Sequence, residues 1–228
     1  WYTALPQGSW PCNVLSNHDQ PRSFSRYGSG NDAAPRAKVL AALLLTLKGT
    51  PFLYYGEEIG MADGKIGKRA LQDPVGKKYW PLYKGRDRAR TPMQWSTQPY
   101  AGFSRVKPWL PVNPDYTDVN VARQAEDPDS ILNFYKNLIA LRRTKPALQH
   151  GDWTYINNDV AAMAYYRSTN DSCMAVWLNF SRRAKTPVVL NPHRWEVVFG
   201  THKQPGAVLQ GFDFALAPYE VAILEQLK

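Results

Sequence analysis

The sequence predicts an α/β region followed by an all-β region, and three features agree on this. An apolar strand, an apolar helix and a second apolar strand follow one another between residues 11 and 56. After Gly151 the apolar residues change to the spacing of strands. The chain has 228 residues and is 44% hydrophobic, which is enough for one or two packed cores. We therefore expect two domains, residues 1–149 and residues 150–228.

The α/β region begins with a strand–helix–strand unit. Residues 11–17, PCNVLSN, form a short apolar run that ends in a polar loop. Residues 36–48 are apolar on most sides and follow a polar cap with a proline in the first turn, so they predict a helix that packs against a sheet. Residues 50–56, TPFLYYG, predict a strand buried on both faces of a parallel sheet. Such a succession forms a right-handed βαβ unit.

A long segment, residues 61–127, separates this unit from the next helix. It is rich in aromatic residues and proline and shows no clear period, which is typical of a functional loop with short elements of its own. Its tryptophans Trp80, Trp95 and Trp109 offer stacking surfaces for sugars, but we expect them to pack the loop over the domain. Apolar residues from Ile131 onward then recur at helical spacing until Pro146 stops the pattern.

The all-β region consists of short apolar runs separated by turn residues. These runs are AMAYYRS, SCMAVWLNF, TPVVL, WEVVFG and YEVAILEQL. Their β-branched and aromatic composition predicts a small antiparallel domain.

One stretch of the α/β region carries residues suited to chemistry. Residues 16–28, SNHDQPRSFSRYG, place His18, Asp19 and Arg22 directly after the first strand. Ligands of parallel α/β sheets bind beyond the carboxyl ends of the strands. A His–Asp pair can hold two adjacent sugar hydroxyls, because the imidazole donates to one and the carboxylate accepts from the other. The alternative is a capping aspartate beside a histidine with satisfied hydrogen bonds.

Several longer motifs accompany this stretch in a fixed order. Residues 17–22 are NHDQPR, residues 49–61 are GTPFLYYGEEIGM and residues 86–95 are RDRARTPMQW; AGFS, PWLPVNPDY, VNVARQ and SILNFYKNLIALRR follow. In order and spacing they resemble the C-terminal part of the α-amylase family of glycoside hydrolases, family 13. Within it they look most like the α-glucosidase and oligo-1,6-glucosidase branch. The resemblance is strong through residue 149 and architectural beyond it.

The resemblance implies a fold and roles for individual residues. The fold is a (β/α)8 TIM barrel followed by an antiparallel β-sandwich, domain C. Residues 11–17 would be the seventh barrel strand and residues 52–58 the eighth. Asp19 matches the family's third carboxylate, which binds glucose hydroxyls and stabilises the transition state. His18 and Arg22 match its substrate-binding neighbours, while Arg90 lies near the site without an assigned contact.

Two further catalytic carboxylates of the family have no counterpart in this chain. Retaining hydrolysis needs a nucleophile and a general acid about 5–5.5 Å apart, and in the family they follow the fourth and fifth strands. Glu57 and Glu58 match a structural feature of the eighth strand, so we do not expect them to be catalysts. A barrel of this kind closes with eight strands. We therefore expect an N-terminal half of the same barrel, as a separate or cleaved chain, to complete this one and to cover its strands and the helix around Val39.

The implied function is removal of terminal α-linked glucose from short α-glucosides or malto-oligosaccharides, with retention and without a cofactor or metal. Two alternatives stay open. One is a trehalose synthase or transglucosidase of the same family. The other is a non-catalytic, glucosidase-like interaction subunit, for which we would expect a membrane anchor and loss of the pair His18 and Asp19.

Charge and cysteine content bear on partners and compartment. The net charge is +9, and nine Lys and Arg lie between Lys65 and Arg90. The segment has no nucleic-acid-binding motif, so we expect a solvated loop or one that faces an acidic neighbour, and no nucleic-acid partner. No apolar run is long enough to span a membrane. Cys12 and Cys173 fall in different predicted domains, which favours two buried thiols and a cytoplasmic location.

Overall fold

The computed structural model describes residues 4–6, 8–28, 30–156, 161–186, 193–210 and 215–227. The chain groups into two compact units. The first is Trp1–Asn13, Val39–Phe52 and Leu138–Lys228, and the second is Val14–Lys38 and Leu53–Asn137. Both units therefore contain parts of the predicted α/β region, and the boundary near residue 149 stays a prediction.

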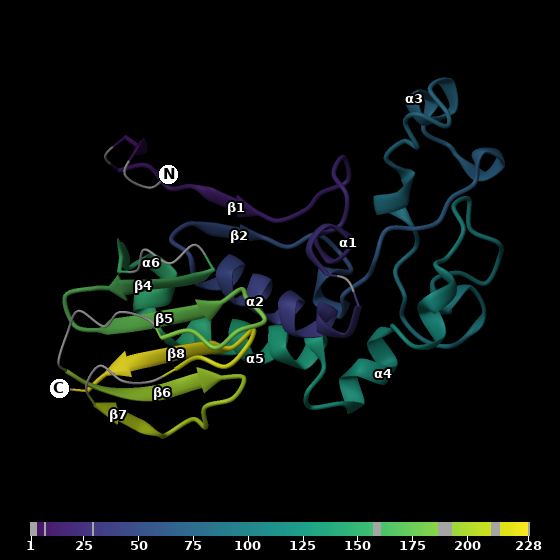
Figure 1. Cartoon of the computed structure of the whole chain (residues 1–228). Helices are drawn as coiled ribbons and strands as arrows, with labels where there is room; N and C mark the ends of the chain where they lie inside the picture. The colour runs from purple at the N-terminus through teal and green to yellow at the C-terminus, as the bar shows by residue number, and fades with distance from the viewer. Residues whose placement is uncertain are drawn as a thin grey trace. The chain divides into compact units, whose positions relative to one another are not determined.

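The first unit contains an antiparallel sheet of six strands in the order β3–β4–β5–β8–β6–β7 (Figure 1). The strands are β3 (Asp152–Tyr155), β4 (Ala162–Ser168), β5 (Cys173–Asn179), β6 (Arg194–Gly200), β7 (Val208–Gln210) and β8 (Val221–Gln226). The last strand lies between β5 and β6, so it is paired on both sides. Four strands coincide with predicted runs, whereas β3 and β7 were missed because they are short. The run at residues 186–190 falls largely outside the described residues. The described strands after residue 150 pair in this one sheet, and the second sheet of a β-sandwich stays a prediction.

One face of this sheet buries an apolar core. Ala164, Trp177, Trp195 and Leu224 are at most 2% exposed and belong to one cluster. Tyr166 stacks on Trp195 with ring centroids 5.6 Å apart. Alternate residues of a strand point to the same face, so a period of two is enough to assemble such a core.

The helices agree in part with the predictions. They are α1 (Ser23–Tyr27), α2 (Ala33–Thr46), α3 (Pro74–Lys78), α4 (Val121–Glu126), α5 (Ile131–Thr144) and α6 (Pro146–His150). Helix α2 has Pro35 in its first turn, and α5 ends before Pro146, as predicted. Short 3-10 helices occupy Gly30–Asp32, Glu57–Ile59, Lys68–Ala70, Asp87–Arg90, Pro99–Gly102 and Pro114–Thr117. None of the helices within the described ranges is long and apolar enough to cross a bilayer.

Two arginines of the first unit bind the carbonyls that helices leave unpaired at their C-terminal ends. Arg142 of α5 donates to the carbonyl oxygens of Leu45 (2.6 Å) and Leu148 (2.6 Å). Arg167 of β4 is fully buried and donates to the carbonyls of Thr46 (2.5 Å) and Gly151 (2.9 Å). Terminal helix carbonyls need such partners when they are buried. These contacts join the sheet to the end of α2.

A separate pair of short strands, β1 (Cys12–Val14) and β2 (Thr50–Phe52), forms a two-stranded sheet. Both are shorter than predicted. Val14 and Phe52 are each 53% exposed, as expected for strands that pair only with each other among the described residues. The expected exposure of the helix around Val39 is wrong, because Val39 is 1% exposed within the chain. Cys12 and Cys173 are free thiols, but Cys12 is exposed rather than buried, since it lies on this narrow sheet.

The second unit is held by small apolar clusters and by buried polar side chains. Ile59, Met61, Met93 and Leu132 form one cluster, and Ile66, Leu71 and Leu110 form another, against which Trp80 packs. Buried Asp73, Asp87, Gln94, Asn113 and Asn120 lie among them. Gln94 donates to the Val119 carbonyl (2.7 Å), and Asn113 donates to the Ala62 carbonyl (2.9 Å). Side-chain hydrogen bonds of this kind fix a loop that has no strand ladder.

Candidate functional site

The loop after β1 carries the predicted site residues in a defined turn. Asn17 Oδ1 accepts hydrogen bonds from the backbone N–H groups of Asp19 (2.8 Å) and Gln20 (3.1 Å). An asparagine side chain that bonds the backbone two residues ahead mimics a turn. The loop therefore fixes the backbone of Asp19 through its own hydrogen bonds, independently of contacts to the Asp19 side chain.

The Asp19 carboxylate is held by two arginines from a distant segment of the second unit. Arg90 Nη2 lies 2.9 Å and Arg86 Nη1 lies 3.2 Å from Asp19 Oδ1. The other oxygen, Oδ2, lies 3.5 Å from His18 Nε2. Arg90 also donates from Nε to the His18 carbonyl at 2.9 Å. The structure thus brings His18 and Asp19 together, as predicted, and adds Arg86 and Arg90.

This arrangement divides the two oxygens of Asp19 between two tasks. Oδ1 receives both guanidinium groups, and charge-assisted hydrogen bonds are among the stronger ones. Within the described residues, the His18 imidazole is the one basic side chain within 4 Å of Oδ2. The side chains of Asp19 and His18 are 47% and 65% exposed, respectively, so both are accessible to a ligand. An accessible carboxylate oxygen beside an imidazole can accept from one hydroxyl while the ring nitrogen binds its neighbour.

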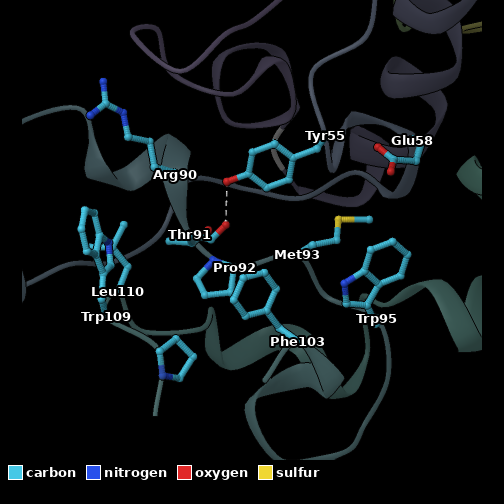
Figure 2. Close-up of a pocket in the computed structure, with 11 residues that line it drawn as sticks. Tyr55, Glu58, Arg90, Thr91, Pro92, Met93, Trp95, Phe103, Trp109 and Leu110 are labelled. Atoms are coloured by element: carbon cyan, nitrogen blue, oxygen red, sulfur yellow. Dashed lines mark hydrogen bonds between the residues drawn. The ribbon is translucent and has the colours of Figure 1, made fainter. Parts of the chain in front are cut away.

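Two tyrosines anchor the segment that carries the arginines. The Tyr54 hydroxyl donates to the Ala89 carbonyl (3.1 Å), and the Tyr55 hydroxyl donates to the Thr91 carbonyl (2.8 Å), a contact drawn in Figure 2. Burial raises the pKa of Tyr54, which keeps it a donor at neutral pH. The two acceptor residues, Ala89 and Thr91, flank Arg90 in sequence, so these hydrogen bonds fix the backbone around Arg90.

Arg22 lies away from the Asp19 carboxylate in the contacts of this structure. It is 1% exposed, stacks over Tyr55 at 4.7 Å from the ring centroid, and donates to the Tyr55 carbonyl (2.5 Å). Its Nε and Nη2 have no hydrogen-bond partner within the described residues. A guanidinium in this position stabilises the segment that follows β2, so these contacts favour a structural role. Substrate binding by Arg22 stays a prediction.

Glu57 is also buried, and the expectation that it is not a catalyst stays a prediction. It is 4% exposed, accepts a hydrogen bond from the Ser16 hydroxyl, and accepts another from the Tyr54 backbone N–H at 3.3 Å. Burial raises the pKa of Glu57, while the Ser16 and Tyr54 hydrogen bonds act in the opposite direction. Its contacts therefore join the loop before Asp19 to the end of β2.

An aromatic cavity of about 690 Å³ lies beside Arg90 and Thr91 (Figure 2). Its lining includes Tyr55, Glu58, Arg90, Met93, Trp95, Phe103 and Trp109. Trp95 is 50% and Trp109 is 76% exposed within this chain, so their packing over a complete barrel stays a prediction. Trp80, by contrast, does pack. The cavity joins the Asp19 site through Arg90, which belongs to both.

The basic segment between Lys65 and Arg90 is partly neutralised by the unit to which it belongs. Arg86 pairs with Asp73 and Asp19, and Arg88 lies 3.7 Å from Asp63. In the part of the chain that the structure describes, no three His, Cys, Asp or Glu side chains gather as a metal site.

Comparison with known sequences supports the resemblance. Residues 1–151 match the family model described as alpha amylase, catalytic domain. A probable alpha-glucosidase of Rhizobium meliloti is 38% identical over 82% of this chain and 34% of its own length. An oligo-1,6-glucosidase of Parageobacillus thermoglucosidasius is 34% identical over 100% of this chain and 42% of its own length. The chain thus spans less than half the length of these relatives.

Solved structures give the same result. Trehalulose synthase MutB of Pseudomonas mesoacidophila MX-45 matches with a TM-score of 0.85 at 31% identity, covering 96% of this chain and 43% of that one. A mutant of an isomaltulose synthase from Erwinia rhapontici NX5, solved with D-glucose, matches with a TM-score of 0.84 at 28% identity over 95% of this chain and 43% of its own. The motifs, the fold and the family model agree. The chain belongs to the alpha-amylase family, and most of it is part of that family's catalytic domain.

Proposed function

We propose that this chain is the C-terminal part of a retaining α-glucosidase and supplies its sugar-binding carboxylate, Asp19. The observation that carries the proposal is that the two oxygens of this carboxylate have different neighbours. Arg86 and Arg90 hold Oδ1, while Oδ2 lies 3.5 Å from His18 Nε2 and both side chains are partly exposed. Relatives with 34–38% identity are named glucosidases, which supports hydrolysis of short α-glucosides.

The geometry suits the charge that develops during glycoside cleavage. As the sugar ring approaches an oxocarbenium ion, its hydroxyls become better hydrogen-bond donors. A fixed carboxylate oxygen that accepts from one of them binds the transition state more tightly than the substrate, and this difference accelerates the reaction. His18 would hold the neighbouring hydroxyl. Asp19 itself forms no covalent bond in this scheme.

The nucleophile and the general acid come, in this proposal, from an N-terminal segment of the same barrel. Residues 11–17 and 52–58 would then be its seventh and eighth strands, with the domain boundary near residue 149. The exposed side chains of Val14 and Phe52 give that segment apolar surface to cover. Glu57 is buried and bonded to Ser16, which makes it a poor substitute for either missing carboxylate.

A glucosyl-transferring enzyme is the second candidate, because the solved structures in the comparison are named trehalulose and isomaltulose synthases. Their identity to this chain is 28% and 31%, below that of the named glucosidases. Product analysis with sucrose separates the two: an isomerase yields an isomeric disaccharide, whereas a glucosidase yields monosaccharides.

The test is hydrolysis of 4-nitrophenyl α-D-glucopyranoside by this chain alone and after mixing with the N-terminal segment that carries the first six strands. The proposal expects activity in the mixture and none with either part alone. Association without hydrolysis of any α-glucoside contradicts it. Hydrolysis by this chain alone also contradicts it, since Glu57 and Glu58 would then have to act as the catalytic pair.

A further inference from the structure

The Arg86 guanidinium bridges two carboxylates of very different exposure. Its Nη1 donates to Asp19 Oδ1 at 3.2 Å, while Nη2 and Nε donate to Asp73 Oδ1 (3.1 Å) and Oδ2 (3.3 Å). The Asp73 side chain is 0% exposed, whereas that of Asp19 is 47% exposed. Arg86 therefore has one buried partner and one partner in the candidate site, joined through a single planar group.

Asp73 is itself fixed in place by its surroundings. Its Oδ2 accepts the backbone N–H of Arg86 (2.9 Å), and its Oδ1 accepts that of Val75 (3.3 Å) at the start of α3. Its own backbone N–H donates to Asp87 Oδ2 (2.8 Å), which also accepts from Gln72 (2.6 Å). The Arg86 side chain lowers the pKa of Asp73 to about 2. A buried carboxylate with several donors is a rigid anchor.

Two glycines allow this close packing. Gly85, just before Arg86, has a φ of +76°, and a Cβ there would meet Asp73 Oδ2 and Gly76 Cα, each at 3.0 Å. A Cβ on Gly76 would meet Gly85 Cα at 2.8 Å. Side chains at either position would push α3 away from the Arg86 backbone. The position of Arg86 thus depends on two glycines that make room for Asp73 and α3.

Arg90 reaches Asp19 from a backbone held by Tyr54 and Tyr55, but its guanidinium contacts no anchoring carboxylate besides Asp19 within the described residues. It bonds both the Asp19 carboxylate and the His18 carbonyl, which belong to the same loop. Arg86 instead connects that loop to Asp73, a buried group outside it. A bidentate guanidinium–carboxylate pair has a fixed geometry, so Asp73 sets the orientation of the planar Arg86 guanidinium and thereby of the group that contacts Asp19.

We propose that Asp73 is a positioning residue: through Arg86 it holds Oδ1 of Asp19, so that Oδ2 is presented to a sugar hydroxyl. This inference rests on the proposed function of Asp19 and adds a residue that never touches the substrate. It predicts that loss of the Asp73 charge disturbs turnover more than substrate binding, since Asp19 acts mainly on the transition state.

The experiment compares Asp73→Asn, Arg86→Met and the double variant in the completed enzyme. In Asp73→Asn an NH2 group replaces one of the two oxygens that accept from Arg86, so the two-point contact between the side chains is lost. We expect kcat to fall roughly 10- to 100-fold, with a smaller change in KM. Both changes break the same bridge, so the double variant should lose no more than the worse single variant. Its thermal stability should exceed that of Arg86→Met, which leaves a buried carboxylate unpaired.

Asp118→Asn is the matched control. It removes an Arg–Asp pair of the same unit, with Arg123 at 2.9 Å, that is exposed and makes no contact with Asp19. Its kcat should stay within about twofold of the wild type. An Asp73→Asn enzyme as active as this control, or losses that add in the double variant, would overturn the proposal.

A second readout needs no activity. The 13C NMR signal of the Asp19 carboxyl carbon should shift in Asp73→Asn and stay unchanged in Asp118→Asn. An unmoved signal in Asp73→Asn refutes the bridge. If the signal moves but the wild-type enzyme hydrolyses no α-glucoside, the proposed function fails while the bridge stands.

Discussion

The antiparallel sheet and the long loop segment of the second unit keep their shapes by different means. In the sheet, Trp177, Trp195 and Leu224 are buried in one apolar core. In the loop segment, Asp73 and Asp87 are buried instead, and backbone N–H groups surround them. The stabilisation from apolar packing is roughly proportional to the buried area and does not require each atom at an exact position. Hydrogen-bonded carboxylates demand individual donors, so they place a side chain such as Arg86 at a defined point.

The largest effect should come from removing an apolar group from the sheet. Trp177→Ala removes an indole that is 1% exposed and leaves a cavity in the core. We expect a loss of roughly 3–5 kcal/mol in the free energy of unfolding. Urea denaturation, followed by circular dichroism, measures it. Trp109→Ala is the matched control, since that side chain is 76% exposed and its loss should cost about 0.5 kcal/mol or less. Equal losses in the two variants would remove the distinction between the regions.

Acid should affect the loop segment through Asp73. The Arg86 side chain lowers the pKa of this carboxyl to about 2, from 3.8. A lowered folded-state pKa adds stability above the unfolded-state value, and that stability is lost as the pH falls from about 4 to 2. The contribution is on the order of 2 kcal/mol at neutral pH. NMR signals of residues 72–90 should therefore lose dispersion in this interval in the wild type.

The comparison for the acid experiment is Asp73→Asn, which lacks the titrating group. Its stability should depend less on pH between 4 and 2 than that of the wild type, while Asp118→Asn should behave as the wild type does. Identical acid profiles for wild type and Asp73→Asn would show that the buried carboxylate does not stabilise the segment.

The elements held by apolar packing were largely predictable from the sequence. The runs at Ala162–Ser168 and Cys173–Asn179 alternate as strands do, and Ile131–Thr144 has a helical period that ends before a proline. Strands β3 and β7 were not predicted, because Asp152–Tyr155 and Val208–Gln210 are too short to establish a period. The spacing of apolar residues indicates which face of a helix or strand is buried, but a period can be recognised only over several residues.

The site was predictable in part, for a related physical reason. His18 and Asp19 are adjacent in sequence, so their pairing could be expected from the motif. The bridge through Arg86 could not, because Asp73 lies 13 residues before it in a segment without a period. Its place depends on the positive φ of Gly85 and on the buried Asp87. The sequence signal for it is a carboxylate that caps a short helix with proline in the first turn, DPVG, followed by GRD.

The most direct test of the account is the turnover of Asp19→Asn in the completed enzyme. The change keeps the size of the side chain but removes the charge that Arg86 and Arg90 bind. We predict a loss of roughly a thousandfold in kcat for 4-nitrophenyl α-D-glucopyranoside, an unchanged melting temperature within about 2 °C, and near wild-type activity for Asp118→Asn. Undiminished turnover by Asp19→Asn would contradict the claim that this carboxylate stabilises the transition state.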